Sequence, residues 1–148
     1  IDHVLTFEEV AAMMVGAGIN IAEVEIKEDY QTEASKDGNI FARAGGVIQA
    51  VIDTGADIVP EVAIKPQRSE GLANCKTILL QMKKGLIDAN LFEGMACVGG
   101  CVGGPGVLAD YRVTTKMIEN FAVASPIVKA SQNVLAEEEM KKNHHWHQ

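Results

Sequence analysis

The chain has 148 residues, of which 47% are apolar and 22% charged, the composition of one ordinary globular domain. Its net charge of −7 argues against nucleic-acid binding, because recognition of phosphates requires clustered lysines and arginines. No apolar run reaches the roughly 18 residues of a membrane span, no secretory signal opens the chain, and three cysteines are a poor disulfide framework, so a reducing, cytoplasmic setting is expected.

The first predicted helix begins after Thr6. Thr6 and Glu9 have the spacing of a capping box, in which each side chain accepts a hydrogen bond from the other residue's backbone N–H. Gly18 predicts the end of this helix, because glycine readily takes the left-handed conformation of a C-terminal cap. Residues 21–26 alternate between apolar and acidic and predict a strand, and the polar residues 27–38 predict a surface loop.

A second helix is predicted over residues 40–52, with Gly45 and Gly46 in its middle. Glycine lowers helix stability, and the usual reason for its presence is the close approach of another backbone. Arg43 lies in the same apolar segment and is expected to pair with a carboxylate that the sequence does not name. The residues predicted to face inward are Phe41, Ala44, Ile48 and Ile52.

Residues 61–65 and 91–95 are predicted as two short strands, the first of them ended by Pro66. Between them lies a predicted helix closed by Gly85, whose inner face consists of Leu72, Cys75, Ile78, Leu79 and Met82. A strand, a helix and a strand in this order predict a βαβ unit with parallel strands. Cys75 is therefore expected to be a core residue and not a ligand.

Two further helices are predicted near the C-terminus. The first covers residues 113–124, with Val113, Met117 and Phe121 facing inward. Ser125 is expected to cap the second, which starts at Pro126, the favoured first position for proline. Ion pairs at (i, i+4) spacing are predicted in this last helix, Glu137 with Lys141 and Glu138 with Lys142.

These elements predict one α/β domain over residues 1–140, a small, mainly parallel sheet flanked by helices. Residues 141–148 are predicted to be a disordered tail, because nothing in the sequence fixes the geometry of its histidines, His144, His145 and His147. Residue 1 is Ile and not Met, so the chain is expected to be cut from a longer protein.

The segment with the clearest chemistry reads Cys-Val-Gly-Gly-Cys-Val-Gly-Gly-Pro-Gly over residues 97–106. Glycine lets the backbone lie close to a bound object, and successive free N–H groups can point at an anion. Thiolates with converging N–H donors are what an iron–sulfur cluster requires. The loop should leave the carboxyl end of a parallel strand, where open α/β sheets bind ligands, and should be the least ordered internal segment when no cluster is bound.

A single Cys-x-x-x-Cys pair does not settle this interpretation, and a glycine-rich turn with two thiols remains the alternative. A zinc site usually has a second cysteine or histidine pair, and a redox disulfide usually has the spacing Cys-x-x-Cys. A cubane cluster takes four cysteines. If Cys97 and Cys101 hold a cubane, the other ligands therefore come from outside this chain.

The motif Met-Ala-Cys-x-Gly-Gly-Cys-x-x-Gly over residues 95–104, with Glu93 before it, resembles the third cysteine signature of iron-only ([FeFe]) hydrogenases. The likeness extends over about residues 2–108, including Asp-His-Val-Leu-Thr at residues 2–6 and Gly-Gly-Val at residues 45–47. The resemblance implies the second lobe of a hydrogenase catalytic domain, at the C-terminal part of the large subunit.

The resemblance also implies a function for the parent protein, the interconversion of protons, electrons and dihydrogen at a [4Fe–4S] cubane linked to a two-iron centre. It assigns Cys97 and Cys101 as cubane ligands, with Cys101 also bridging to the two-iron centre beside Met95. The cluster-binding glycines would be Gly99, Gly100, Gly103 and Gly104. The implied partners are the upstream part of the same catalytic domain and an electron carrier such as ferredoxin, and the isolated chain is expected to be inactive without a bound cluster.

Two departures from the family pattern lie beside the cysteines. Residues 102–106 read Val-Gly-Gly-Pro-Gly where the family commonly has Gly-Gly-Gly-Gln-Pro, and Gly94 stands where Val is usual. These changes resemble the divergent, sensory branches of the family. A sensor of redox or dihydrogen state that keeps the cluster, and a non-catalytic domain with structural cysteines, therefore remain as alternatives.

Overall fold

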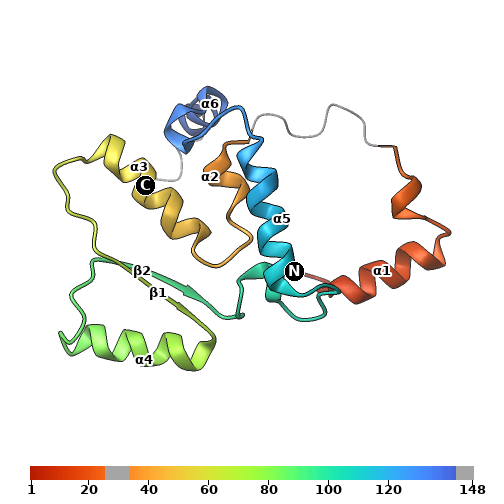
Figure 1. The fold of residues 1–148 in the computed structure, drawn as a ribbon, viewed down its shortest axis with the longest axis horizontal. Helices are drawn as coiled ribbons and strands as arrows, with labels where there is room; N and C mark the ends of the chain where they lie inside the picture. Colours follow the sequence, from red (N-terminus) through yellow and green to blue (C-terminus); the bar gives the residue numbers. More distant parts are fainter. Residues whose placement is uncertain (26–33, 143–148) are drawn as a thin grey trace.

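The computed structural model describes residues 1–25 and 34–142 (Figure 1). Over these residues the helices are α1 (Phe7–Gly16), α2 (Lys36–Asn39), α3 (Gly46–Ile58), α4 (Leu72–Lys83), α5 (Tyr111–Val123) and α6 (Val134–Lys142). Two strands, β1 (Pro66–Glu70) and β2 (Leu91–Met95), form the sheet. Short 3₁₀ turns occupy Ile21–Glu23, Cys101–Gly103 and Ala130–Gln132.

Strands β1 and β2 are parallel, and α4 forms the crossover between them, which confirms the predicted βαβ unit. The pairing runs from Pro66 opposite Leu91 to Glu70 opposite Met95. Both α3 and α4 contact the strands, and they lie on opposite sides of the pair in Figure 1. The small parallel sheet flanked by helices therefore agrees with the predicted fold class.

The position of the first strand is a correction. It was expected at residues 61–65 with Pro66 as its end, whereas Pro66 is its first residue. Proline lacks a backbone N–H and is tolerated at the first position of a strand, where it removes no essential ladder bond. The loop before it is held instead by Asn90, whose Oδ1 accepts from the Lys65 N–H at 2.7 Å.

Helix α1 begins and ends as predicted. The Thr6 N–H donates to Glu9 Oε2 at 2.7 Å and the Glu9 N–H donates to Thr6 Oγ1 at 3.2 Å, which completes the capping box. At the other end Gly18 has φ +71°, and the Ile19 N–H reaches back to the Met14 carbonyl at 2.9 Å. These bonds satisfy backbone groups that a helix end otherwise leaves without partners.

The strand predicted at residues 21–26 is not formed, since Ile21–Glu23 is a 3₁₀ turn and Ile26 lies outside the described residues. Asn20 favours the turn, because its Oδ1 accepts from the Ala22 N–H at 3.2 Å and competes with extended pairing. Of the loop predicted over residues 27–38, residues 27–33 are outside the described part, and Lys36–Asn39 is helix α2.

Helix α3 starts at Gly46 and not near residue 40, and it runs on to Ile58. The chain turns sharply before it, with Gly45 at φ +79°. A Cβ on Gly46 would lie 1.9 Å from the Ile40 carbonyl oxygen, so the predicted close approach of another backbone is confirmed. Because the turn separates Phe41 from the helix, Phe41 is 48% exposed, whereas Ile48 is buried as predicted.

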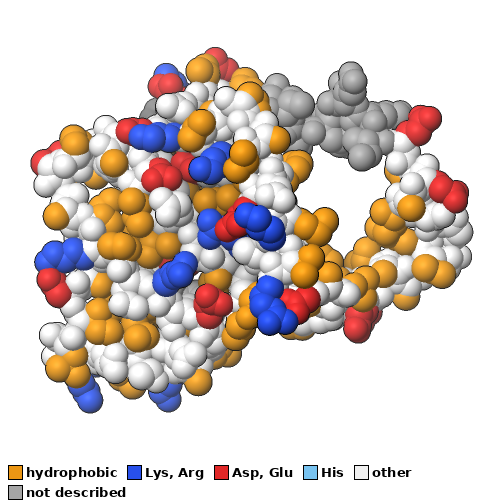
Figure 2. All heavy atoms as spheres, viewed as in Figure 1, with side chains coloured by type: hydrophobic (Ala, Val, Ile, Leu, Met, Phe, Trp, Pro, Cys, Tyr) orange, Lys and Arg blue, Asp and Glu red, His pale blue; other side chains and the backbone are white. Residues whose placement is uncertain are grey.

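Helix α5 matches its prediction in position but not in its buried face. Val113, Met117 and Phe121 are 58%, 65% and 65% exposed, and the buried residue is Ala122 on another face. No described element covers the exposed stripe. Figure 2 shows the same tendency more widely, with hydrophobic side chains spread over the visible face of the molecule. The described chain therefore exposes apolar surface that a larger assembly would bury.

The last helix is α6, which starts at Val134 and not at Pro126. Ser125 does not cap a helix, and its Oγ accepts instead from Asn39 Nδ2 at 2.8 Å, which ties the chain after α5 to α2. Helix α6 ends at Lys142 and so includes the first two residues, 141 and 142, of the predicted tail.

The ion pairs of α6 are partly as predicted. Lys141 Nζ lies 2.7 Å from Glu137 Oε1, which confirms that pair. Lys142 pairs with Glu139 at 2.7 Å, at (i, i+3) spacing, and not with Glu138. The histidine-rich tail from residue 143 lies outside the described residues. Among the helices that are described, none has the length and apolar character to cross a membrane.

Candidate functional site

The two predicted ligand cysteines lie on the loop that leaves the carboxyl end of β2, as expected. Cys97 is half-buried and Cys101 is exposed at the start of a 3₁₀ turn. Met95 is the last residue of β2 and is half-buried. Cys75 is buried in α4, where its Sγ lies 3.5 Å from the carbonyl oxygens of Ser69 and Met95. The structure therefore places Cys75 in the core and the other two thiols at the loop.

The backbone N–H groups of the cysteine loop, residues 97–104, are largely occupied by acceptors of this chain. The Gly99 N–H donates to Glu70 Oε2 at 2.7 Å. The other four N–H groups donate to carbonyl oxygens: Gly100 to Cys97 (3.2 Å), Val102 to Ala42 (3.2 Å), Gly103 to Gly100 (3.1 Å) and Gly104 to Cys101 (3.1 Å). The expectation that these donors converge on a bound anion is wrong for these five groups. These bonds hold the loop to the rest of the chain, and its low order without a cluster stays a prediction for amide exchange over residues 97–106.

The residues before α3 form one wall of the cysteine loop. Arg43 and Gly100 form an isolated antiparallel bridge, and the Ala44 N–H donates to the Gly99 carbonyl at 3.0 Å. A Cβ on Gly100 would lie 2.5 Å from the Ala44 nitrogen, and Gly100 has φ +82°. Glycine is therefore required at residue 100 both by backbone conformation and by the close approach of a second backbone.

The start of α5 closes the loop from the other side. A Cβ on Gly99 would lie 2.4 Å from Tyr111 Cδ2, so the loop packs directly on the Tyr111 ring. A Cβ on Gly103 would lie 1.9 Å from the Val98 carbonyl oxygen, whereas one on Gly104 would lie 3.1 Å from the nearest atom. Three of the four motif glycines, residues 99, 100 and 103, are thus fixed by contacts within this chain.

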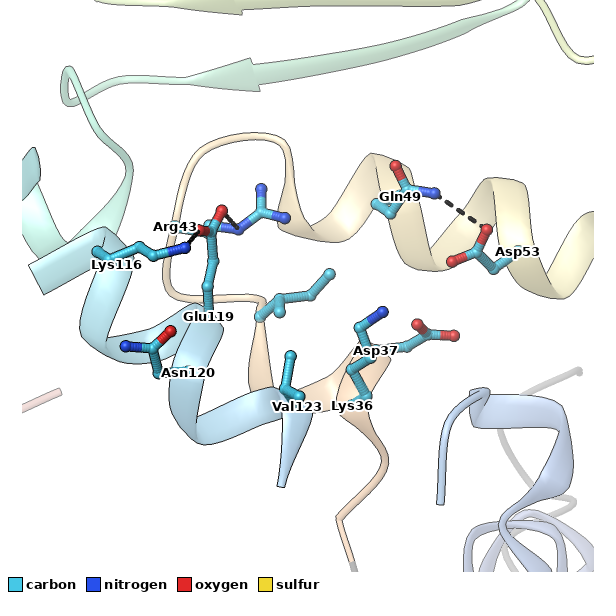
Figure 3. Close-up of a pocket in the computed structure, with 10 residues that line it drawn as sticks. Lys36, Asp37, Arg43, Gln49, Asp53, Lys116, Glu119, Asn120 and Val123 are labelled. Atoms are coloured by element: carbon cyan, nitrogen blue, oxygen red, sulfur yellow. Dashed lines mark hydrogen bonds and ion pairs between the residues drawn. The ribbon is translucent and has the colours of Figure 1, made fainter. Parts of the chain in front are cut away.

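Arg43 finds the carboxylate that the sequence left unnamed. Its Nε lies 3.5 Å from Glu119 Oε1 on α5, and Lys116 Nζ lies 3.6 Å from the other oxygen of Glu119 (Figure 3). Arg43 Nη1 also donates to the Ala44 carbonyl at 3.0 Å. Although Nε is buried, it makes no hydrogen bond to any described residue, so the pair with Glu119 is a long one. Arg43 nevertheless links the wall of the cysteine loop to α5.

These charged side chains line a polar cavity of about 370 Å³ between α2, α3 and α5 (Figure 3). Burial raises the pKa of the Asp37 carboxyl on its wall, and the Ala130 N–H that bonds to Asp37 opposes this shift. A second cavity, of about 500 Å³ and nearly all apolar, lies between α1, α5 and Cys101. An apolar shell of this kind limits solvent access to a metal site and influences its reduction potential.

Glu93 has a role that the sequence analysis did not find. It lies in the middle of β2 and is only 8% exposed. Its two carboxylate oxygens accept from the Gly45 N–H at 2.6 Å and the Ile48 N–H at 3.1 Å. A carboxylate is favourable there because a helix N-terminus carries free N–H groups and a partial positive charge. Glu93 therefore fixes the start of α3 to β2, the strand that leads into the cysteine loop.

The two loop cysteines would supply half of the four thiol ligands that a cubane cluster takes. Among residues 1–25 and 34–142, no three His, Cys, Asp or Glu side chains form a group that could hold a metal ion. Cys97 and Cys101 nevertheless carry free thiols, the ligand type that iron–sulfur clusters use, on a loop held by backbone hydrogen bonds. The two thiols fit an iron–sulfur cluster only if further ligands come from another part of the protein.

A serine at residue 75 is expected to be tolerated. The two carbonyl oxygens 3.5 Å from Sγ offer acceptors to a hydroxyl, so the penalty of about 1–3 kcal/mol for a buried hydroxyl without a partner should be largely avoided. Urea unfolding of Cys75→Ser should show a loss below about 1 kcal/mol, and Cys75→Val, which has no donor, is the matched control. A loss of several kcal/mol in the serine variant alone would contradict this assignment.

Comparison with known proteins gives one consistent result. Residues 1–105 match the family model described as "Iron only hydrogenase large subunit, C-terminal domain". The chain is 29% identical over 134 residues to Iron hydrogenase 1 of Clostridium pasteurianum, covering 72% of this chain and 23% of that protein. A solved chain of HydA(deltaEFG), from work on [FeFe]-hydrogenase H-cluster assembly, has a TM-score of 0.66 at 18% identity, over 97% of this chain and 52% of that chain. This chain thus spans about a quarter of the curated relative and half of the solved one.

Proposed function

Because the chain belongs to the iron-only hydrogenase large-subunit family, through its C-terminal domain, we propose that it is part of a protein that interconverts protons, electrons and dihydrogen. The observation that carries the proposal is the position of Cys97 and Cys101. Both lie within the matched residues 1–105, on a loop of fixed shape at the carboxyl end of β2. Open α/β sheets bind their ligands at that end of the strands.

In this proposal Cys97 and Cys101 would hold a [4Fe–4S] cubane, and Cys101 would also be the ligand that links it to a two-iron centre. The bound group supplies the electron transfer and the dihydrogen chemistry. The contribution of this chain is to fix the positions of the two thiolates. Gly99 and Gly100 do so through the backbone contacts described above, and Met95 would lie beside the two-iron centre.

The remaining cubane ligands would come from an upstream part of the same catalytic domain, in a cytoplasmic protein that exchanges electrons with a carrier such as ferredoxin. Two observations support a further part of the catalytic domain outside this chain. The chain spans 52% of the solved relative. The apolar stripe on α5 is exposed, although a side chain such as Phe121 gains about 1.5–3 kcal/mol when it is fully buried.

The isolated chain is expected to evolve no dihydrogen from reduced viologen, because two thiols are half of the four ligands that a cubane takes. The same chain, joined to its upstream half and matured with iron, should bind iron and evolve dihydrogen. Dihydrogen evolution by the isolated chain would contradict the ligand count. A reassembled protein that takes up no iron would contradict the proposed function itself.

A second candidate is a sensor that keeps the cluster but turns over slowly, and the departures from the family pattern beside the cysteines favour it. Gly94 is one of them, and a Cβ there would lie 2.8 Å from Phe92 Cε1, so the usual valine would require the Phe92 ring to move. A sensor would assemble the complete cluster and respond to dihydrogen in its spectrum, with turnover far below that of the Clostridium relative. Turnover comparable to that relative would exclude the sensor.

A further inference from the structure

The carboxylate of Glu70 reaches into the interval between the two cysteines. Glu70 is the last residue of β1, paired with Met95 at the end of β2. Its Oε2 accepts from the Gly99 N–H at 2.7 Å, across 29 residues of sequence. A hydrogen bond from a backbone N–H to an ionised carboxylate is shorter and roughly twice as strong as a neutral one. The proposed function assigns no role to Glu70.

Gly99 is held at both ends of its backbone. Its N–H donates to Glu70, and its carbonyl accepts from the Ala44 N–H at 3.0 Å. Gly99 is buried and has φ +88°, with the Tyr111 ring against its Cα. Cys97 and Cys101 stand two residues to either side, so a shift of the Gly99 peptide would move the backbone that carries both thiols.

The Glu70 bond has an electrostatic consequence for any cluster at these thiols. Hydrogen bonds to the sulfurs and the net charge nearby are the main protein influences on cluster potential. The Gly99 N–H donates to Glu70 and is therefore not available to a sulfide of the cluster. In its place the site gains a carboxylate, whose negative charge disfavours the more negative, reduced state of a cluster.

We propose that Glu70 is a positioning residue for the cysteine loop and that its charge lowers the reduction potential of the cluster held there. The positioning role concerns this chain alone, and the effect on the reduction potential rests on the proposed function. Nearby cations do not form an ion pair with Glu70 among the described residues, so its charge is not neutralised by a direct partner.

The test compares three variants. Glu70→Gln keeps an acceptor of the same length but removes the charge, and Glu70→Ala removes both. Glu61→Gln is the matched control, because Glu61 is exposed and outside the strands and loop. Amide exchange at Gly99, followed by NMR in the metal-free protein, reports the hydrogen bond. The midpoint potential and the EPR signal of the cluster, measured in the reassembled and matured protein, report the charge and the thiol geometry.

Glu70→Ala is expected to speed exchange at Gly99 by at least about tenfold, while Glu70→Gln and Glu61→Gln stay within about threefold of wild type. Unchanged exchange in Glu70→Ala would overturn the positioning role. Glu70→Gln is expected to raise the reduced-to-oxidised ratio of the cluster about tenfold at a fixed potential. This equals a midpoint potential about 59 mV higher for one electron. A shift no larger than that of Glu61→Gln would overturn the electrostatic role. If Gly99 responds but wild type binds no iron, the proposed function fails and the positioning role stands.

Discussion

Replacing Cys101 by serine in the reassembled, matured protein is expected to lower dihydrogen turnover by more than about 100-fold, since changes merely around a metal site already cost 10–100-fold. In the proposed function Cys101 is both a cubane ligand and the bridge to the two-iron centre. A hydroxyl is a poor substitute for a bridging thiolate between soft iron centres. The measurements are dihydrogen evolution from reduced viologen and iron per folded protein.

The two other cysteines serve as controls in the same host. Cys97→Ser is expected to damage the cubane but to leave a partly assembled site, so its iron content should fall between that of Cys101→Ser and wild type. Cys75→Ser should keep the full iron content, because Cys75 is buried in α4 and is not one of the two thiols on the loop. Loss of iron in Cys75→Ser, together with full iron and turnover in Cys101→Ser, would show that the ligands are wrongly assigned.

Replacing Gly103 by alanine is expected to lower the free energy of unfolding by about 3 kcal/mol or more, at the upper end of overpacking effects. The added Cβ would lie 1.9 Å from the Val98 carbonyl oxygen. That atom belongs to the backbone between the two cysteines, so no side-chain rotation relieves the clash. The loop must change shape or the residue must leave its turn. Urea denaturation followed by circular dichroism measures the loss.

Gly104→Ala is the matched control for this prediction. It adds the same methyl group one residue later, where the nearest atom is 3.1 Å away and the backbone is extended, with φ −69°. The cost there should be below about 1 kcal/mol, within the usual range for single substitutions. Equal denaturation midpoints for the two variants would mean that the loop does not have the packed form described for Gly103.

The elements that were predicted correctly are those whose signals are local. Thr6 and Glu9 determine the start of α1 by a bond across three residues, and β2 follows from its own short apolar pattern. The location of Cys97 and Cys101 followed from β2, because a loop after a parallel strand has a known position. Local hydrogen bonds and periodicity are properties of the sequence itself, and no distant contact was needed to find these features.

The errors arose where distant contacts decide the structure. Residues 66–70 read Pro-Gln-Arg-Ser-Glu, which has little strand pattern, and they form β1 because β2 pairs with them. Helix α3 starts late because Glu93 bonds to the Gly45 and Ile48 N–H groups from 48 and 45 residues away. Two acceptors of the cysteine loop, Glu70 and the Ala42 carbonyl, are also remote in sequence. Their identity depends on the register of β1 and β2, which the sequence pattern had misplaced by five residues.

The anchors of the cysteine loop have a definite order along the chain. Ala42, Ala44 and Glu70 all precede Cys97 in the sequence, and Tyr111 follows Cys101. Since domains fold as units while a chain is synthesised from its N-terminus, the early anchors exist before the ribosome has made either thiol. The loop can close as soon as Tyr111 emerges. Both thiols therefore join a loop whose anchors within this chain are complete once Tyr111 has been synthesised.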